Sequence, residues 1–79
     1  MENFERIFYT VLINKLNVDQ EELTPDKLFY DLGANSLDMV ELIIELERAF
    51  SITIPDEDAE KIISIGDAEL YLKSKLNIH

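Results

Sequence analysis

Apolar residues recur at helical spacing along most of this chain, and this periodicity restricts the possible folds more than any other feature. It is clearest over residues 36–50, SLDMVELIIELERAF, which contain neither glycine nor proline. Asn35 is the natural N-cap of that helix, and Asp38 stands at the third helical position, where its carboxylate can bond back to the cap. Ser36 falls in the first turn, with its hydroxyl free. Such a pattern predicts an all-α protein.

The same periodicity predicts three more helices, at about residues 3–16, 56–62 and 65–76. Pro55 followed by acidic residues is typical of a short helix start, and it marks the third helix. Ser64 and Asp67 form a capping pair at the start of the fourth helix. We therefore expect four helices, of which the third is short.

Residues 17–35 lack this periodicity and are predicted to form a long connection between helices 1 and 2. Thr24 followed by Pro25 is a good start for one helical turn within it. No linker or second hydrophobic pattern is apparent. The prediction is a single domain over residues 1–79, folded as a small four-helix bundle.

Charge and composition restrict the partners of this bundle. Its 79 residues include 17 acidic and 7 basic side chains, for a net charge of −10, and residues 19–60 alone hold 13 acids and 2 bases. This disfavours nucleic acid and anionic lipid and favours basic partners. Without cysteine, a hydrophobic core alone must hold the fold. The sequence shows neither a membrane-spanning apolar run nor a secretory signal, so a cytoplasmic protein without membrane insertion is expected.

The helix predicted over residues 36–50 carries apolar residues on two faces. Its broad core side consists of Met39, Leu42, Ile43, Leu46 and Phe50. A second stripe, Leu37, Val40 and Ile44, is centred on a different side of the helix. This stripe either packs beneath the long connection, through Leu28 or Phe29, or forms an exposed docking strip with a charged rim. Spacing alone leaves both possibilities open.

Ser36 is a poor candidate for a hydrolase nucleophile. The surrounding GANSL lacks the glycine that a G-x-S-x-G elbow requires after the serine, and the only histidine, His79, is the last residue. A phosphodiester on Ser36 would instead lie beside the free amides and the positive dipole end of the helix. The acidic residues that follow Pro55 lack the spacing of a calcium loop, so no metal site is predicted. They are Asp56, Glu57, Asp58 and Glu60.

The run DLGANSLDMVELIIELERAF, followed by IPDEDAEKI, resembles the acyl carrier protein family, close to the freestanding carriers of bacterial-type fatty acid synthesis. The resemblance covers essentially the whole chain. Its central motif is D-x-G, a small residue, a usually acidic one and SLD, continued by V-E-L. In that family the serine of SLD carries a 4′-phosphopantetheine arm, taken from coenzyme A, whose thiol holds acyl groups as thioesters. The resemblance implies this role for Ser36 and implies a carrier rather than an enzyme.

The resemblance also implies a docking surface and a slot for the acyl chain. Partner contact is expected on the helix after the serine, at Leu37, Asp38, Val40, Glu41, Ile44, Glu47 and Arg48. A slot inside the bundle would be lined by Leu46, Ile54, Ala59, Ile62 and Ala68, which are equally compatible with a plain core. The expected partners are a phosphopantetheinyl transferase and acyl-transfer, ketosynthase or ligase enzymes with basic docking patches. The carrier itself is expected to be a monomer.

Two residues depart from the family's usual pattern. Asn35 stands where an acid is common, although it can still cap the helix, and Arg48 also stands where an acid is common. Both make the docking face less negative, which leaves open whether the partners belong to housekeeping fatty acid synthesis or to a specialised pathway. The alternative function, from a different class, is an acidic helical interaction module without a prosthetic group.

Overall fold

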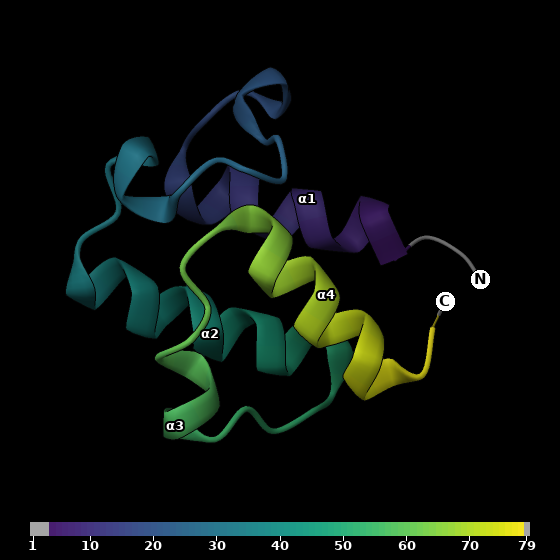
Figure 1. Cartoon of the computed structure of the whole chain (residues 1–79). Coiled ribbons are helices and arrows are strands. Elements are labelled where there is room, and N and C mark those ends of the chain that lie inside the picture. Colours follow the sequence, from purple (N-terminus) through teal and green to yellow (C-terminus); the bar gives the residue numbers. More distant parts are fainter. Residues whose placement is uncertain (1–3, 79) are drawn as a thin grey trace.

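The computed structural model describes residues 4–78, and within them it contains four α-helices and no strand (Figure 1). The helices are α1 (Phe4–Leu16), α2 (Ser36–Phe50), α3 (Asp56–Ala59) and α4 (Ile65–Leu76). The predicted all-α bundle is confirmed. Asn3, the first residue of the first predicted helix, and His79 lie outside the described residues. No described helix has the length and apolar character that crossing a membrane requires.

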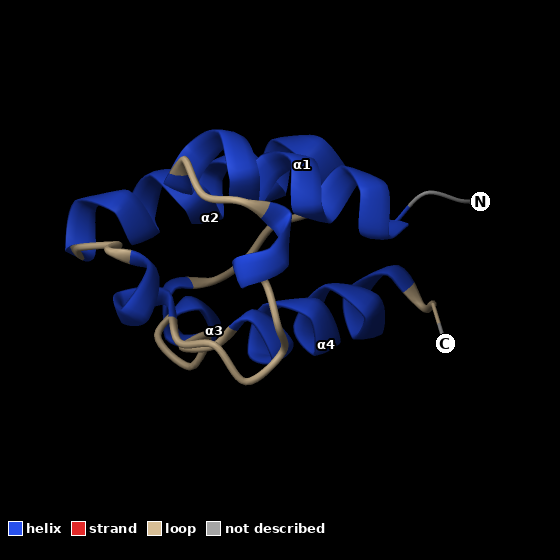
Figure 2. Cartoon of the chain, turned by 90° about the horizontal axis from the view of Figure 1, so that it is seen from above, coloured by secondary structure: helices blue, strands red, loops and turns tan. Residues whose placement is uncertain are grey.

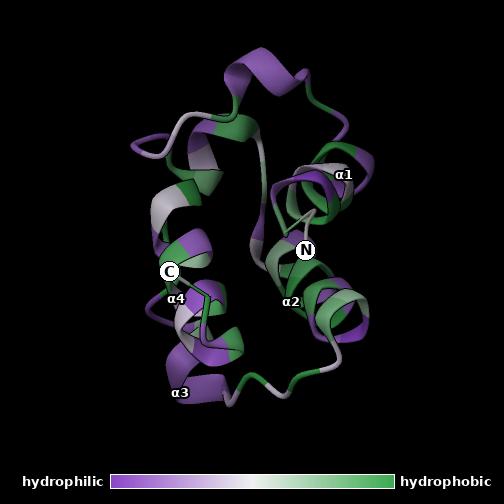
Figure 3. Cartoon of the chain, turned by 90° about the vertical axis from the view of Figure 1, so that its right-hand side faces the viewer, coloured by the Kyte–Doolittle hydropathy of each residue, from purple (hydrophilic) through white to green (hydrophobic). Residues whose placement is uncertain are grey.

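The helices form two layers around one core. α1 and α2 lie side by side in one layer, and α3 and α4 make up the other (Figures 2 and 3). The largest side chains with no exposed surface come from α1, α2 and α4, namely Phe8, Leu12, Leu42, Leu46, Ile65 and Leu72. Burying each one stabilises the fold by about 1.5 to 3 kcal/mol relative to leaving it exposed. A core this small makes each of these residues important for stability.

α2 begins where the cap residues predict. The Asn35 side chain accepts a hydrogen bond from the Asp38 amide at 2.8 Å, and the Asp38 carboxylate accepts one from the Asn35 amide at 3.0 Å. This reciprocal pair satisfies two backbone donors at the start of the helix. The helix ends at Phe50 and is capped by Ser51, whose φ of 56° is left-handed and whose amide donates to the Glu47 carbonyl.

α3 is shorter than the predicted helix over residues 56–62. It ends at Ala59 because the following amides bond three residues back: Lys61 donates to the Asp58 carbonyl at 3.0 Å and Ile62 to the Ala59 carbonyl at 3.1 Å. Such bonds tighten the last turn and turn the chain out of the α-helix. Ile62 is thereby brought into the core with 5% of its surface exposed.

The long connection contains two 3₁₀ helices, η1 (Gln20–Glu22) and η2 (Phe29–Leu32). The helical turn predicted to start at Thr24 and Pro25 is present as a single turn, in which the Lys27 amide donates to the Thr24 carbonyl at 3.0 Å. It lies between the two 3₁₀ helices and continues neither of them.

Backbone hydrogen bonds attach the long connection to the start of α4. The Phe29 amide donates to the Ile63 carbonyl and the Ile65 amide to the Lys27 carbonyl, each at 3.0 Å. The Gly66 amide adds a third bond, to the Pro25 carbonyl at 2.8 Å. These bonds explain how a segment without helical periodicity is held in place, and they position η2 next to α2.

Gly66 is required by the close approach of Pro25. A Cβ at this position would lie 2.9 Å from the Pro25 carbonyl oxygen, a backbone atom. Gly66→Ala is therefore expected to destabilise the fold by about 1 to 3 kcal/mol, although alanine is the better helix former. Urea unfolding measures the change, with the exposed Ser74→Ala in α4 as control. Equal or higher stability of Gly66→Ala would contradict this packing.

Asp67 makes the start of α4 sensitive to pH. The Ile63 and Ser64 amides donate to its carboxylate, each at 3.1 Å, and lower its pKa from the ordinary value of 3.8. A carboxyl whose pKa falls on folding stabilises the fold above its unfolded pKa, and this contribution disappears as pH falls through the folded pKa. Asp67→Asn should therefore lower the Tm at neutral pH, and this difference should shrink as the pH falls below the ordinary pKa of 3.8. A Tm difference that is constant over this range would contradict the assignment.

Candidate functional site

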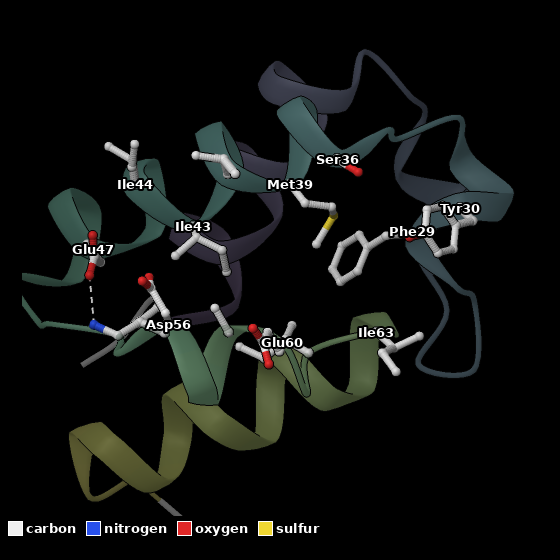
Figure 4. Close-up of a pocket in the computed structure, with 14 residues that line it drawn as sticks. Phe29, Tyr30, Ser36, Met39, Ile43, Ile44, Glu47, Asp56, Glu60 and Ile63 are labelled. Atoms are coloured by element: carbon white, nitrogen blue, oxygen red, sulfur yellow. Dashed lines mark hydrogen bonds between the residues drawn. The ribbon is translucent and has the colours of Figure 1, made fainter.

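Ser36 is the first residue of α2, and its side chain is exposed. It lies at the rim of a pocket of about 630 Å³ between α2 and α3 (Figure 4). The cap uses the Asp38 amide and leaves the first-turn amides of Ser36 and Leu37 outside the helical hydrogen-bonding pattern. Free amides and the positive end of the helix dipole suit a phosphate ester at this position.

The pocket is mainly apolar and opens to the surface. Its apolar lining consists of Phe29, Met39, Val40, Ile43, Ile44, Ile54, Ala59, Ile62 and Ile63. The other lining residues are Tyr30, Ser36, Glu47, Asp56 and Glu60. The pocket therefore joins an exposed hydroxyl to an apolar space large enough for a small ligand.

The predicted slot residues separate into two groups. Ile54, Ala59 and Ile62 line the pocket, whereas Leu46 and Ala68 do not line it and have no exposed surface. Leu46 and Ala68 are thus core residues.

Sequence reasoning missed several residues of the pocket. The spacing predicts Met39 and Ile43 on the core side of α2, and they do pack partly against the core, but they also line the pocket. Met39 and Ile43 thus lie at the boundary between the core-facing side of α2 and its pocket-facing side. Tyr30 and Ile63 lie in segments without helical periodicity, so no pattern could identify them.

The second apolar stripe of α2 is exposed. Leu37 is 64% exposed, Val40 55% and Ile44 43%. Of the two alternatives, packing of this stripe beneath Leu28 or Phe29 is excluded, because its three side chains are exposed, Phe29 is buried in the core and Leu28 is itself 40% exposed. Leu37, Val40 and Ile44, called the α2 strip below, thus form an accessible apolar surface beside Ser36.

The charged residues around the α2 strip differ in how firmly they are held. Glu41 pairs with Lys15 of α1 at 3.5 Å, and Arg48 lies 3.8 Å from Glu45. The Arg48 side chain is 75% exposed. Asp38 is engaged in the cap of α2. Pairs as exposed as these contribute little to stability, so Glu41 and Arg48 are accessible to a partner.

Glu47 has a structural contact that the sequence does not predict. Its carboxylate accepts a hydrogen bond of 2.7 Å from the Ile54 amide, in the segment that leads into α3 (Figure 4). On the other side of α3, the Tyr71 hydroxyl donates to the Asp58 carboxylate at 2.7 Å. Burial, followed by this hydrogen bond, raises the pKa of Tyr71 to about 12. Because α3 contains no buried residue, these two bonds help to hold the wall of the pocket.

Among residues 4–78, no three His, Asp or Glu side chains are grouped so that they could hold a metal ion. The acidic residues in and after α3 make other contacts. Asp56 and Glu60 line the pocket, and the Asp58 carboxylate accepts a hydrogen bond from Tyr71.

Comparison with known protein families adds to this geometry. The family model described as phosphopantetheine attachment site matches residues 7–72. The match extends from α1 into α4 and includes Ser36 and every residue that lines the pocket. It favours a carrier of a prosthetic group over an interaction module without one.

Proposed function

Because the chain belongs to the phosphopantetheine attachment site family, whose members carry 4′-phosphopantetheine and are not catalysts, we propose that this carrier protein holds the group on Ser36. The observation that supports this residue most is its place: an exposed hydroxyl at the start of α2, on the rim of an apolar pocket. When attached, the group supplies a thiol that holds acyl cargo as a thioester. The chain would deliver this cargo to partner enzymes at a raised effective concentration.

The start of α2 is suited to hold the phosphodiester end of the arm. A phosphopantetheinyl transferase would join the Ser36 oxygen to the phosphate taken from coenzyme A. The two first-turn amides left free by the cap, together with the dipole of α2, would favour the negative charge on that phosphate. Because Asn35 replaces the usual acid, the charge meets less repulsion from the cap residue.

The pocket supports a fatty acyl cargo. An acyl chain attached near Ser36 could enter the space between α2 and α3 and contact Met39, Ile43 and Ile62. Each buried methylene would contribute about 0.8 kcal/mol. We therefore propose that this carrier serves fatty acid biosynthesis or a related specialised pathway.

The α2 strip is proposed as the docking surface for the transferase and for acyl-transfer, ketosynthase or ligase enzymes. Its apolar residues are exposed, and Glu41 and Asp38 add negative charge beside them. An apolar centre with a charged rim is typical of transient interfaces. Long-range attraction to basic patches would raise encounter rates without making the complexes long-lived.

Glu41→Gln is expected to weaken partner binding about twofold to fivefold at low salt, because it removes one exposed charge from this surface. The salt dependence of binding should decrease with it. Glu21→Gln is the matched control, since it removes an identical charge from η1 (Figure 1). Binding of the transferase, measured at several salt concentrations, tests the assignment. Equal effects of the two variants would contradict a docking surface on α2.

Loading of the protein tests the central proposal. Incubation with coenzyme A, magnesium and a broad-specificity phosphopantetheinyl transferase should add the mass of one phosphopantetheine group, observed by intact-protein mass spectrometry. Fragmentation should locate the added mass at Ser36. No added mass with several transferases would overturn the proposal.

A further inference from the structure

Tyr30 is a large aromatic side chain that the fold leaves in solvent. It is 69% exposed, although its neighbour in η2, Phe29, is 2% exposed and anchored in the core. The Phe29 amide bonds to the Ile63 carbonyl at 3.0 Å, and the Gly33 amide bonds to the Tyr30 carbonyl at 3.0 Å. The backbone of Tyr30 is thus fixed on both sides. The ring is presented to solvent on a turn whose backbone is held in place, so only the side-chain torsions of Tyr30 have to be ordered when a ligand binds to it.

Tyr30 and Ser36 lie at the same end of the pocket. Both line it, and they come from opposite sides of its mouth, Tyr30 from η2 and Ser36 from α2 (Figure 4). Val40 and Ile63, which are 55% and 50% exposed, continue the apolar rim. A group attached to the Ser36 oxygen therefore leaves the protein surface at the end of the pocket where Tyr30 also lies.

We propose that Tyr30 is a positioning residue for the phosphopantetheine arm, against which the first part of the arm packs as it leaves Ser36. This inference rests on the proposed attachment at Ser36. The chemistry of the two surfaces is complementary. Beyond its phosphate the arm carries a carbon with two methyl groups, followed by amides. The aromatic face can pack against the methyl groups, and the phenol hydroxyl can hydrogen-bond to an amide.

Contact with Tyr30 would favour arm conformations that lie across the pocket mouth. From there the thioester end can reach either the apolar pocket or a partner bound on the α2 strip. Tyr30 would thus act through the arm and would not touch the reacting atoms. The phosphate end of the arm would be held by the bond to Ser36 and by the first turn of α2.

The test uses holo protein whose loading at Ser36 has first been verified by mass, so failure of attachment is distinguished from failure of this inference. The arm is isotopically labelled, and NMR records the resonances of its two methyl groups. In the natural protein these resonances should be displaced from their positions in free phosphopantetheine by the aromatic ring current. Cross-relaxation should connect them to the Tyr30 ring protons.

Three variants separate the possible causes. Tyr30→Phe should keep the displacement, whereas Tyr30→Leu should return the methyl resonances to the positions of the free group although an apolar side chain remains. Leu70→Ala is the control, because Leu70 is 71% exposed but does not line this pocket. All four proteins should show the same Tm, since the side chains of Tyr30 and Leu70 are both largely exposed.

Two results would overturn the proposal. Undisplaced methyl resonances in the natural holo protein would show that the arm does not contact the ring. A displacement that persists in Tyr30→Leu would assign the contact to Phe29, the other aromatic residue that lines the pocket. Weaker transferase binding by Tyr30→Leu with unchanged methyl resonances would likewise overturn it and identify Tyr30 as a partner contact.

Discussion

Ser36→Ala is expected to abolish loading with phosphopantetheine completely. The substitution removes the oxygen that would be esterified and little else. The side chain is exposed, and α2 is capped by Asn35 and Asp38, so the helix start does not depend on the serine. Stability should change by less than about 0.5 kcal/mol. Intact-protein mass after incubation with coenzyme A, magnesium and a transferase gives an all-or-none result.

Ser74→Ala provides the matched control for loading. Ser74 is another exposed serine, near the end of α4, and it does not line the pocket. Its alanine variant should load as the natural protein does. If Ser36→Ala still gained the mass of one group, the attachment would lie on another hydroxyl, and the function proposed for this pocket rim would be wrong.

Leu46→Ala is expected to destabilise the fold by roughly 2 to 5 kcal/mol, because it leaves a cavity in a core that can collapse only in part. Leu46 has no exposed surface and lies in α2 with Leu42 in the same core cluster. For a domain of this size the total stability is only about 5 to 15 kcal/mol. The variant should therefore lose a large fraction of its stability, as measured by urea unfolding.

Leu37→Ala is the matched control for the core, since it makes the same change in the same helix. Leu37 is 64% exposed, so its loss should alter stability by less than about 0.5 kcal/mol, whereas partner binding should weaken. The pair thus separates the two apolar faces of α2. Equal destabilisation by Leu37→Ala and Leu46→Ala would contradict this separation.

The sequence predicted α2 and α4 accurately because their signals are local. Both ends of each helix agree with the structure, and the cap bonds between Asn35 and Asp38 form as predicted. The capping pair of Ser64 and Asp67 forms in the same way. Caps and helical periodicity act over three or four residues, so they can be recognised without knowing the rest of the fold.

Features that depend on contacts between distant segments were predicted poorly. α3 was expected to reach residue 62, but it ends at Ala59, where the chain turns Ile62 into the core. The bond from the Ile54 amide to the Glu47 carboxylate also depends on the position of the next segment, and the docking role expected for Glu47 stays a prediction. The conformation of residues 17–35 depends on bonds to the start of α4, which no local pattern encodes.

Local sequence signals were enough to predict that this chain folds into helices, that α2 begins after Asn35 and that Ser36 stands in its first turn, because caps, periodicity and motif spacing extend over only a few residues. The packing of distant segments was needed to distinguish the two environments possible for the α2 strip. Burial depends on what lies opposite a side chain, and Phe29 enters the core instead of covering Leu37, Val40 and Ile44. For the same reason only the packed helices show a pocket that begins at Ser36 and places Tyr30 at its mouth.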